Sequence, residues 1–136
     1  MDREELSVDA LAERFIDAFN RRDADALVAL THPQIVFVPT VLVGQRASYE
    51  THEGLRRWVA ELIASGATHQ VRLRDVRLLD PDRFAALTEV LIEDEVISPS
   101  AMIARLRDGL IVHAAAYLSD ERTLIRVGVL PPRSEA

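Results

Sequence analysis

The sequence predicts an α+β fold in which helices cover one face of an antiparallel sheet. In the first half of the chain, apolar residues recur at helical spacing. From residue 69 onward the apolar period changes to two, and tight turns separate the alternating segments. Helices that come first and strands that follow are typical of an α+β fold with segregated layers.

Three helices are expected in the first half of the chain. Ser7 is a plausible cap for a helix in the segment 7–23, and Asp23 can cap a short helix over 24–30. Thr51 is expected to cap a third helix, with Glu53 favourable near its positive end and Gly66 ending it.

Strands are expected from the alternating and apolar segments. The segment 34–39 is almost wholly apolar, which indicates a strand with both faces covered, and 40–50 is expected to be a loop. A phase slip near Asp75 suggests a bulge in the strand-like segment 69–80. The predicted hairpins are 69–80 with 83–93, turning at 80–82, and 100–119, turning at Asp108-Gly109.

Composition bounds the domain organisation and the possible partners. The chain has 136 residues, which predicts a single domain, with tails at 1–6 and 131–136 expected to be disordered. A net charge of -6 argues against a nucleic-acid partner. The longest apolar stretch, 35–43, is too short to span a membrane, and the N-terminus does not resemble a signal peptide. A cytoplasmic protein is therefore expected.

Residue usage excludes several kinds of chemistry. The chain has no cysteine, and all of its 16 basic residues are arginine. Disulfides, thiolate catalysis and lysine Schiff bases are thereby excluded. The histidines at 32, 52, 69 and 113 show no short ligand spacing, so no metal site and no cofactor is predicted.

Four strings in the order of the predicted elements resemble one family. They are "LAERFIDAFNRRDADALVAL", "HPQIVFVP", "YETHEGLRRWV" and "RDGLIVHAAAYLSDERTL". Together they resemble SnoaL-like proteins of the nuclear transport factor 2-like superfamily, over residues 7–130. The resemblance implies a cone-shaped curved antiparallel sheet wrapped around N-terminal helices, an apolar pocket and, often, a homodimer. Members of this family include steroid isomerases, epoxide hydrolases and polyketide cyclases, so the fold alone does not predict a reaction.

The catalytic positions of the steroid isomerases and epoxide hydrolases do not carry over. The isomerase positions fall on Val38, Phe15 and near Ile103, all of them apolar. The positions of limonene-type epoxide hydrolases fall on apolar Ala116, near Glu89 and Leu91, and near Val36 and Val38. Whether the protein is an enzyme is therefore left open. The resemblance places these residues around an apolar ligand: Phe15, Phe19, Val36, Val38, Trp58, Leu91, Ile103 and Ala116.

Glu89 has two interpretations. The even residues of 84–92 form the bulkier face, which would ordinarily place Glu89 on the solvent side. The family comparison instead places residues 89 and 91 in the pocket. We take the pocket position as our prediction. Glu89 would then lack an arginine partner, and desolvation would raise its pKa.

Two histidines are weaker catalytic candidates. His52 and Glu53 could form an acid-base couple, although the start of a helix explains them as well. His113 and Tyr117 share one strand face, which solvent or a second subunit could also cover. The preferred hypothesis is a pocket protein that binds a small hydrophobic molecule. The alternatives are a hydrolase, isomerase or cyclase that uses Glu89, and a dimerisation module with a filled cavity.

Overall fold

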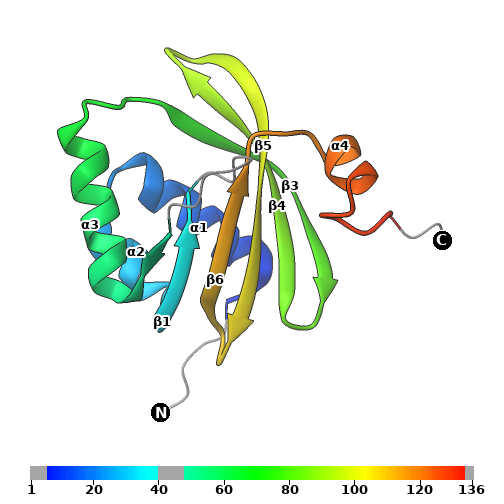
Figure 1. Ribbon diagram of the computed structural model, residues 1–136, viewed down its shortest axis with the longest axis horizontal. Coiled ribbons are helices and arrows are strands. Elements are labelled where there is room, and N and C mark those ends of the chain that lie inside the picture. Colours follow the sequence, from blue (N-terminus) through cyan, green and yellow to red (C-terminus); the bar gives the residue numbers. More distant parts are fainter. Residues whose placement is uncertain (1–5, 40–47, 134–136) are drawn as a thin grey trace.

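The computed structural model describes residues 6–39 and 48–133, which form a curved sheet with helices on both of its faces (Figure 1). The elements within these residues, in chain order, are α1 (Val8–Asn20), α2 (Ala24–Ala29), β1 (Thr31–Val38), β2 (Tyr49–Glu50), α3 (Thr51–Ala64), β3 (Gln70–Asp80), β4 (Arg83–Ile92), β5 (Glu95–Arg107), β6 (Leu110–Tyr117) and α4 (Glu121–Arg126). Residues 40–47 of the predicted loop lie outside the described residues.

The described strands form one sheet in the order β2-β1-β6-β5-β4-β3. The β1–β6 pair is parallel, and every other neighbouring pair is antiparallel. Short turns join the strands of the antiparallel β3-β4-β5-β6 meander. Helices α1, α2 and α3 precede this meander in the chain, and α4 follows it. The α+β prediction is confirmed.

Two of the three predicted capping residues cap their helices in the structure. The Ser7 hydroxyl accepts a hydrogen bond from the Ala10 amide at 3.1 Å, and the Asp23 carboxylate accepts one from the Ala26 amide at 3.1 Å. The prediction that Thr51 caps α3 is wrong. The chain enters α3 directly from β2, so Glu50 is the capping residue, and its side chain makes no capping hydrogen bond.

The hairpins follow the expected turn chemistry. The predicted bulge lies between Leu73 and Asp75. Asp108 and Gly109 both have positive φ, 54° and 77°, as a two-residue hairpin turn requires. A further turn of this kind, at Glu93-Asp94, joins β4 to β5 and was not predicted.

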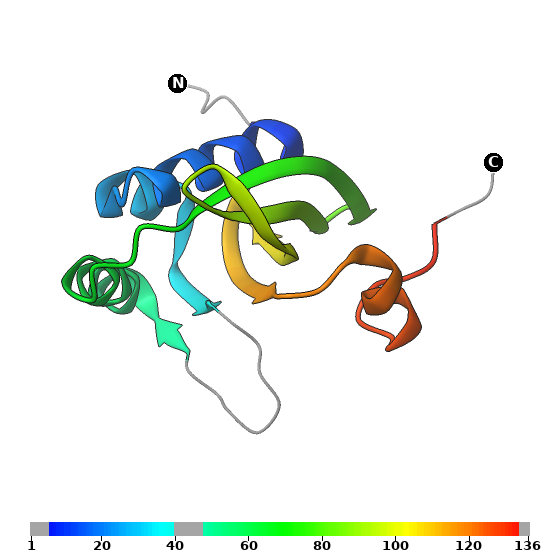
Figure 2. The ribbon, with the colours of Figure 1, turned by 90° about the horizontal axis from the view of Figure 1, so that it is seen from above.

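The main core lies between the inner face of the sheet and helices α1, α2 and α3. Even-numbered residues of β4 face these helices: Phe84 and Ala86 are fully buried in the cluster that also contains Phe15 and Leu55. Figure 2 shows these helices and α4 on opposite sides of the curved sheet. The inner face therefore holds the space in which a ligand could be enclosed.

The outer face of the sheet is partly covered by α4 and the residues after it. Leu124 and Leu130 pack with Ala85 and Ala101 in a second buried cluster. The disorder predicted for 131–136 does not hold for 131–133, because the Arg133 guanidinium lies 3.0 Å from Asp75 and 2.7 Å from Glu121. Residues 1–5 and 134–136 lie outside the described residues.

The helices of the described ranges are too short or too polar for a membrane span. Within 6–39 and 48–133, none is long and apolar enough to cross a bilayer.

Candidate functional site

A cavity of about 330 Å³ lies between α1, α3 and the inner face of the sheet. This volume is at the lower end of the range of about 300–1,000 Å³ that small-molecule sites occupy. Helices α1 and α3 supply one wall, and β1, β3, β4, β5 and β6 supply the other. The cavity walls are thus built from segments that are far apart in the sequence.

Aromatic rings form the helical side of the cavity. The Phe19 and Trp58 rings are stacked, with centroids 5.6 Å apart and an interplanar angle of 19°. The Phe37 ring lies 4.5 Å from Trp58, and the Phe15 ring lies 6.0 Å from Phe37. Contacts of this kind hold the rings in one arrangement and present apolar surface to a ligand.

Four hydroxyl-bearing residues interrupt the apolar wall on the sheet side: Thr88, Ser98, Ser100 and Tyr117. Thr88 of β4 and Ser100 of β5 are directly opposite residues in the antiparallel pair. Their hydroxyl oxygens are 2.6 Å apart, and the two residues are only 7% and 9% exposed. One hydroxyl donates this hydrogen bond and the other accepts it.

His69 is an ionisable residue on the cavity wall. It precedes β3 and lies beside Phe19, with ring centroids 5.6 Å apart. Burial lowers its pKa, and the Arg22 guanidinium lowers it further. The neutral imidazole is therefore favoured in the folded protein, and it can accept or donate a hydrogen bond.

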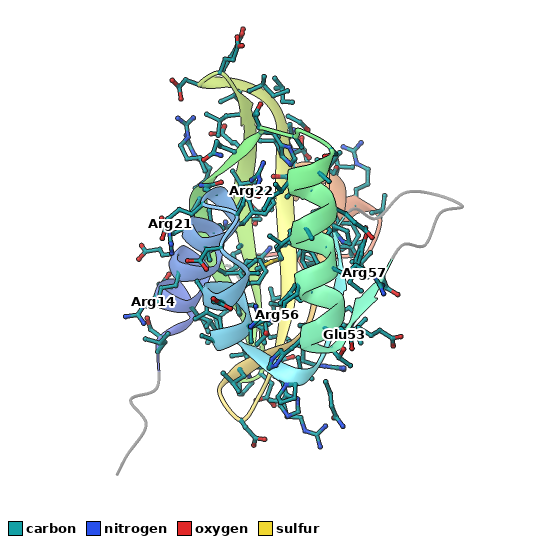
Figure 3. All side chains as sticks on the ribbon, turned by 90° about the vertical axis from the view of Figure 1, so that its left-hand side faces the viewer. Arg14, Arg21, Arg22, Glu53, Arg56 and Arg57 are labelled. Carbon is teal, nitrogen blue, oxygen red and sulfur yellow. The ribbon has the colours of Figure 1, made fainter. Side chains whose placement is uncertain are left out.

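Residues at the end of α1 hold the segment that carries His69. Arg22 donates hydrogen bonds to the carbonyl oxygens of Ala67 and His69, at 3.1 and 2.8 Å. The Asn20 side chain bonds both the amide and the carbonyl of Val71, at 2.8 and 2.9 Å. In Figure 3, Arg22 lies at the end of α1, whereas Arg14 and Arg57 lie on the outside of their helices.

Charged groups are absent from the part of the cavity wall that the structure describes. No aspartate, glutamate or arginine lines it there. Across residues 6–39 and 48–133, no group of three or more His, Asp or Glu side chains could hold a metal ion. The described wall thus offers apolar surface, hydroxyls and one imidazole.

Four of the eight predicted ligand-binding residues line the cavity: Phe15, Phe19, Trp58 and Ala116. The other four, Val36, Val38, Leu91 and Ile103, do not line it. Their chain neighbours Phe37, Val90 and Met102 do. The family comparison was therefore one residue out of register on β1, β4 and β5, and in a strand such a slip exchanges the two faces.

The predicted position of Glu89 is wrong for the same reason. Its carboxylate lies on the outer face, 2.7 Å from the Arg72 guanidinium and 3.4 Å from that of Arg74. The hydrogen bond from Arg72 lowers the pKa of Glu89, where we expected burial to raise it. Arg72 is its direct cross-strand neighbour, a pairing that only the strand register reveals.

The lowered pKa reverses the expected pH dependence of stability. The contribution of the Glu89 ion pairs is present above the ordinary pKa of 4.5 and is lost as pH falls through the folded pKa. We expect the melting temperature of wild type to fall more steeply than that of Glu89→Gln between about pH 6 and about pH 3. In an Arg72→Gln background this difference should shrink. A wild-type stability that instead declines as pH rises through this window would contradict the assignment.

The two candidate histidines lie away from the cavity wall. His52 Nε2 is 2.9 Å from the Thr31 carbonyl oxygen, so the side chain joins the start of α3 to β1. His113 is opposite Arg105 on the neighbouring strand; burial and then Arg105 lower its pKa. Neither histidine lines the cavity.

His69, Thr88 and Ser100 line the cavity but were not predicted to do so. A signal for Thr88 was present, because it shares the bulkier even face of its strand with Phe84 and Ala86. His69 is likewise in phase with Val71, which also lines the cavity.

The model of the SnoaL-like domain family matches residues 12–114. The chain belongs to the SnoaL-like family. This match runs from the middle of α1 to the middle of β6 and includes nearly every element of the cavity wall. No curated protein matches the sequence.

Solved structures with the same fold cover most of the chain. A nuclear transport factor 2-like protein of unknown function from Mesorhizobium loti is 22% identical, with a TM-score of 0.66 over 88% of this chain and 96% of that one. A candidate ketosteroid isomerase from Kribbella flavida is 17% identical, with a TM-score of 0.64 over 93% and 79%. A candidate SnoaL-like polyketide cyclase from Jannaschia is 13% identical, with a TM-score of 0.65 over 98% and 99%. At these identities the likeness shows the fold alone.

Proposed function

We propose that this SnoaL-like protein binds a small, uncharged hydrophobic molecule in the cavity between its helices and its sheet. The observation that carries the proposal is a cavity of about 330 Å³ with an aromatic wall of Phe15, Phe19, Phe37 and Trp58. Burial of apolar ligand surface there is worth about 25 cal/mol per Å² before the costs of binding. A charged ligand would lose its hydration without gaining an opposite charge from the described wall.

A thermal-shift titration tests this function. Neutral terpenoid or steroid probes should raise the melting temperature in proportion to the logarithm of their concentration once the site is near saturation. A neutral steroid and its sulfate ester form a matched pair, since they share one skeleton and differ in charge. We expect the neutral member to bind more tightly. Failure of every neutral probe to shift the melting temperature would contradict the proposal.

An enzyme remains the second candidate, and His69 is the observation that favours it. A neutral imidazole at the wall could accept a proton from a bound substrate, as the isomerase, hydrolase and cyclase alternatives require. Glu89 cannot take this role from the outer face. The third candidate, a module with a filled cavity, is disfavoured by the empty volume.

We also propose a homodimer that uses the outer face of the sheet. Leu124 and Leu130 pack over Ala85 and Ala101, whereas Val36 and Val38 are half-buried and lie outside that cluster. Apolar surface of this kind favours association. Sedimentation equilibrium at micromolar concentration should give twice the mass of one chain, and a monomer mass would contradict the proposal.

A further inference from the structure

The Thr88–Ser100 pair has hydrogen-bonding capacity that the described protein does not use. Two hydroxyl groups carry two O–H protons, and the 2.6 Å contact between their oxygens uses one of them. No other hydrogen bond of either side chain exists among residues 6–39 and 48–133. One proton is therefore left to be donated to something that is not part of the described chain.

The surroundings of the pair make an unused donor costly. The two residues are 7% and 9% exposed, and both line the cavity beside apolar residues such as Val90 and Met102. A buried donor without an acceptor costs about 1–3 kcal/mol. Water could supply the acceptor in the empty cavity, but a purely hydrocarbon ligand that displaced this water would leave the proton without a partner.

We propose that the Thr88–Ser100 hydroxyl pair binds a carbonyl oxygen of the ligand, so that the natural ligand is an uncharged apolar ketone, quinone, ester or lactone. The inference rests on the proposed function, because it concerns a ligand in the same cavity. The two hydroxyls act as a unit: one donates to the other, and the second donates to the carbonyl oxygen. A hydroxyl that already accepts a hydrogen bond is a better donor to the ligand, since hydrogen bonds in a chain strengthen one another.

The strand register explains why the pair can act at a single point. Thr88 and Ser100 are cross-strand partners in the antiparallel β4–β5 pair, so both side chains leave the sheet on the same face. His69 is four residues before Leu73, the β3 residue opposite Thr88. Four residues of strand span about 13 Å, so the imidazole and the hydroxyl pair contact different parts of an elongated ligand.

The test uses two probes that differ at one position. 2-Acetylnaphthalene carries a carbonyl group, and 2-ethylnaphthalene has the same carbon skeleton without the oxygen. Equilibrium dialysis gives the dissociation constant of each probe for wild type and for Thr88→Val/Ser100→Ala. We expect the double variant to bind the ketone roughly three- to tenfold more weakly. Its affinity for the hydrocarbon should stay within about twofold or improve.

A control variant and a second measurement separate the possible explanations. Thr88→Ser keeps both hydroxyls and should retain the affinity for the ketone. The infrared carbonyl stretch of 2-acetylnaphthalene bound to wild type needs no variant, so it remains informative if the double variant fails to fold. A stretch at lower frequency than in an apolar solvent is expected, because a hydrogen bond weakens the C=O bond.

Each outcome bears on one of the two proposals. If neither probe binds wild type, the proposed function fails and this inference fails with it. If both probes bind wild type, either of two results would show that the hydroxyl pair does not bind the ligand. One is an unchanged affinity of the double variant for both probes. The other is a carbonyl stretch of the bound ketone equal to that in an apolar solvent. The cavity would then still stand as a binding site.

Discussion

Replacement of Phe84 by alanine should lower the free energy of unfolding by about 3–5 kcal/mol. Phe84 is fully buried at the start of β4, and its side chain belongs to the core cluster that joins the sheet to the helices. Loss of the ring removes transfer free energy and leaves a cavity that the rigid sheet cannot close. Since domains of this size are stable by about 5–15 kcal/mol, this loss is a large fraction of the total free energy of unfolding.

Leu78→Ala is the matched control for this prediction. Leu78 is the direct cross-strand partner of Phe84, yet it is 61% exposed. Its truncation should change the free energy of unfolding by no more than about 0.5 kcal/mol. Urea denaturation of both variants measures the difference. Equal effects would mean that the inner face of β4 is not the core-facing side.

Replacement of Ala116 by phenylalanine should reduce the affinity for neutral apolar probes at least about tenfold. Ala116 is the small residue that β6 contributes to the cavity wall, opposite Met102 of β5. A ring at this position occupies space that the ligand would otherwise fill. Because the volume of about 330 Å³ is open, the added ring should not force the strongly destabilising strain seen in filled cores.

Ala60→Phe is the control for the cavity variant. It introduces the same side chain at an exposed position on α3. Thermal-shift titrations with one neutral probe should show binding by Ala60→Phe and loss of binding by Ala116→Phe. If Ala116→Phe bound the probe as tightly as wild type, the ligand would have to lie elsewhere.

The local structure could be predicted because it depends on short-range chemistry. Ser7 and Asp23 cap their helices since a side-chain oxygen needs only the amides of the following turn. Asp108-Gly109 forms a hairpin turn because these residue types tolerate positive φ. The α+β class followed from the change in apolar period at residue 69.

Half of the predicted ligand-binding residues line the cavity: all three on helices, but only Ala116 among the five on strands. Phe15, Phe19 and Trp58 lie on helices, where one apolar stripe identifies the buried face without reference to any other element. On β1, β4 and β5 the family comparison chose Val36, Leu91 and Ile103, each one residue from a residue of the cavity wall. Apolar side chains on both faces of a strand do not indicate which face the helices cover.

The sequence by itself therefore determined the fold class, the helix faces and the turns at 80–82 and 108–109 of this SnoaL-like protein. Only the tertiary structure decided that Thr88 faces the cavity and that Glu89 faces Arg72. It also placed α4 over the outer face, where Leu124 and Leu130 cover Ala85 and Ala101. The physical reason is that a strand residue obtains its environment from partners far away in the chain, and a register shift of one residue exchanges all of them.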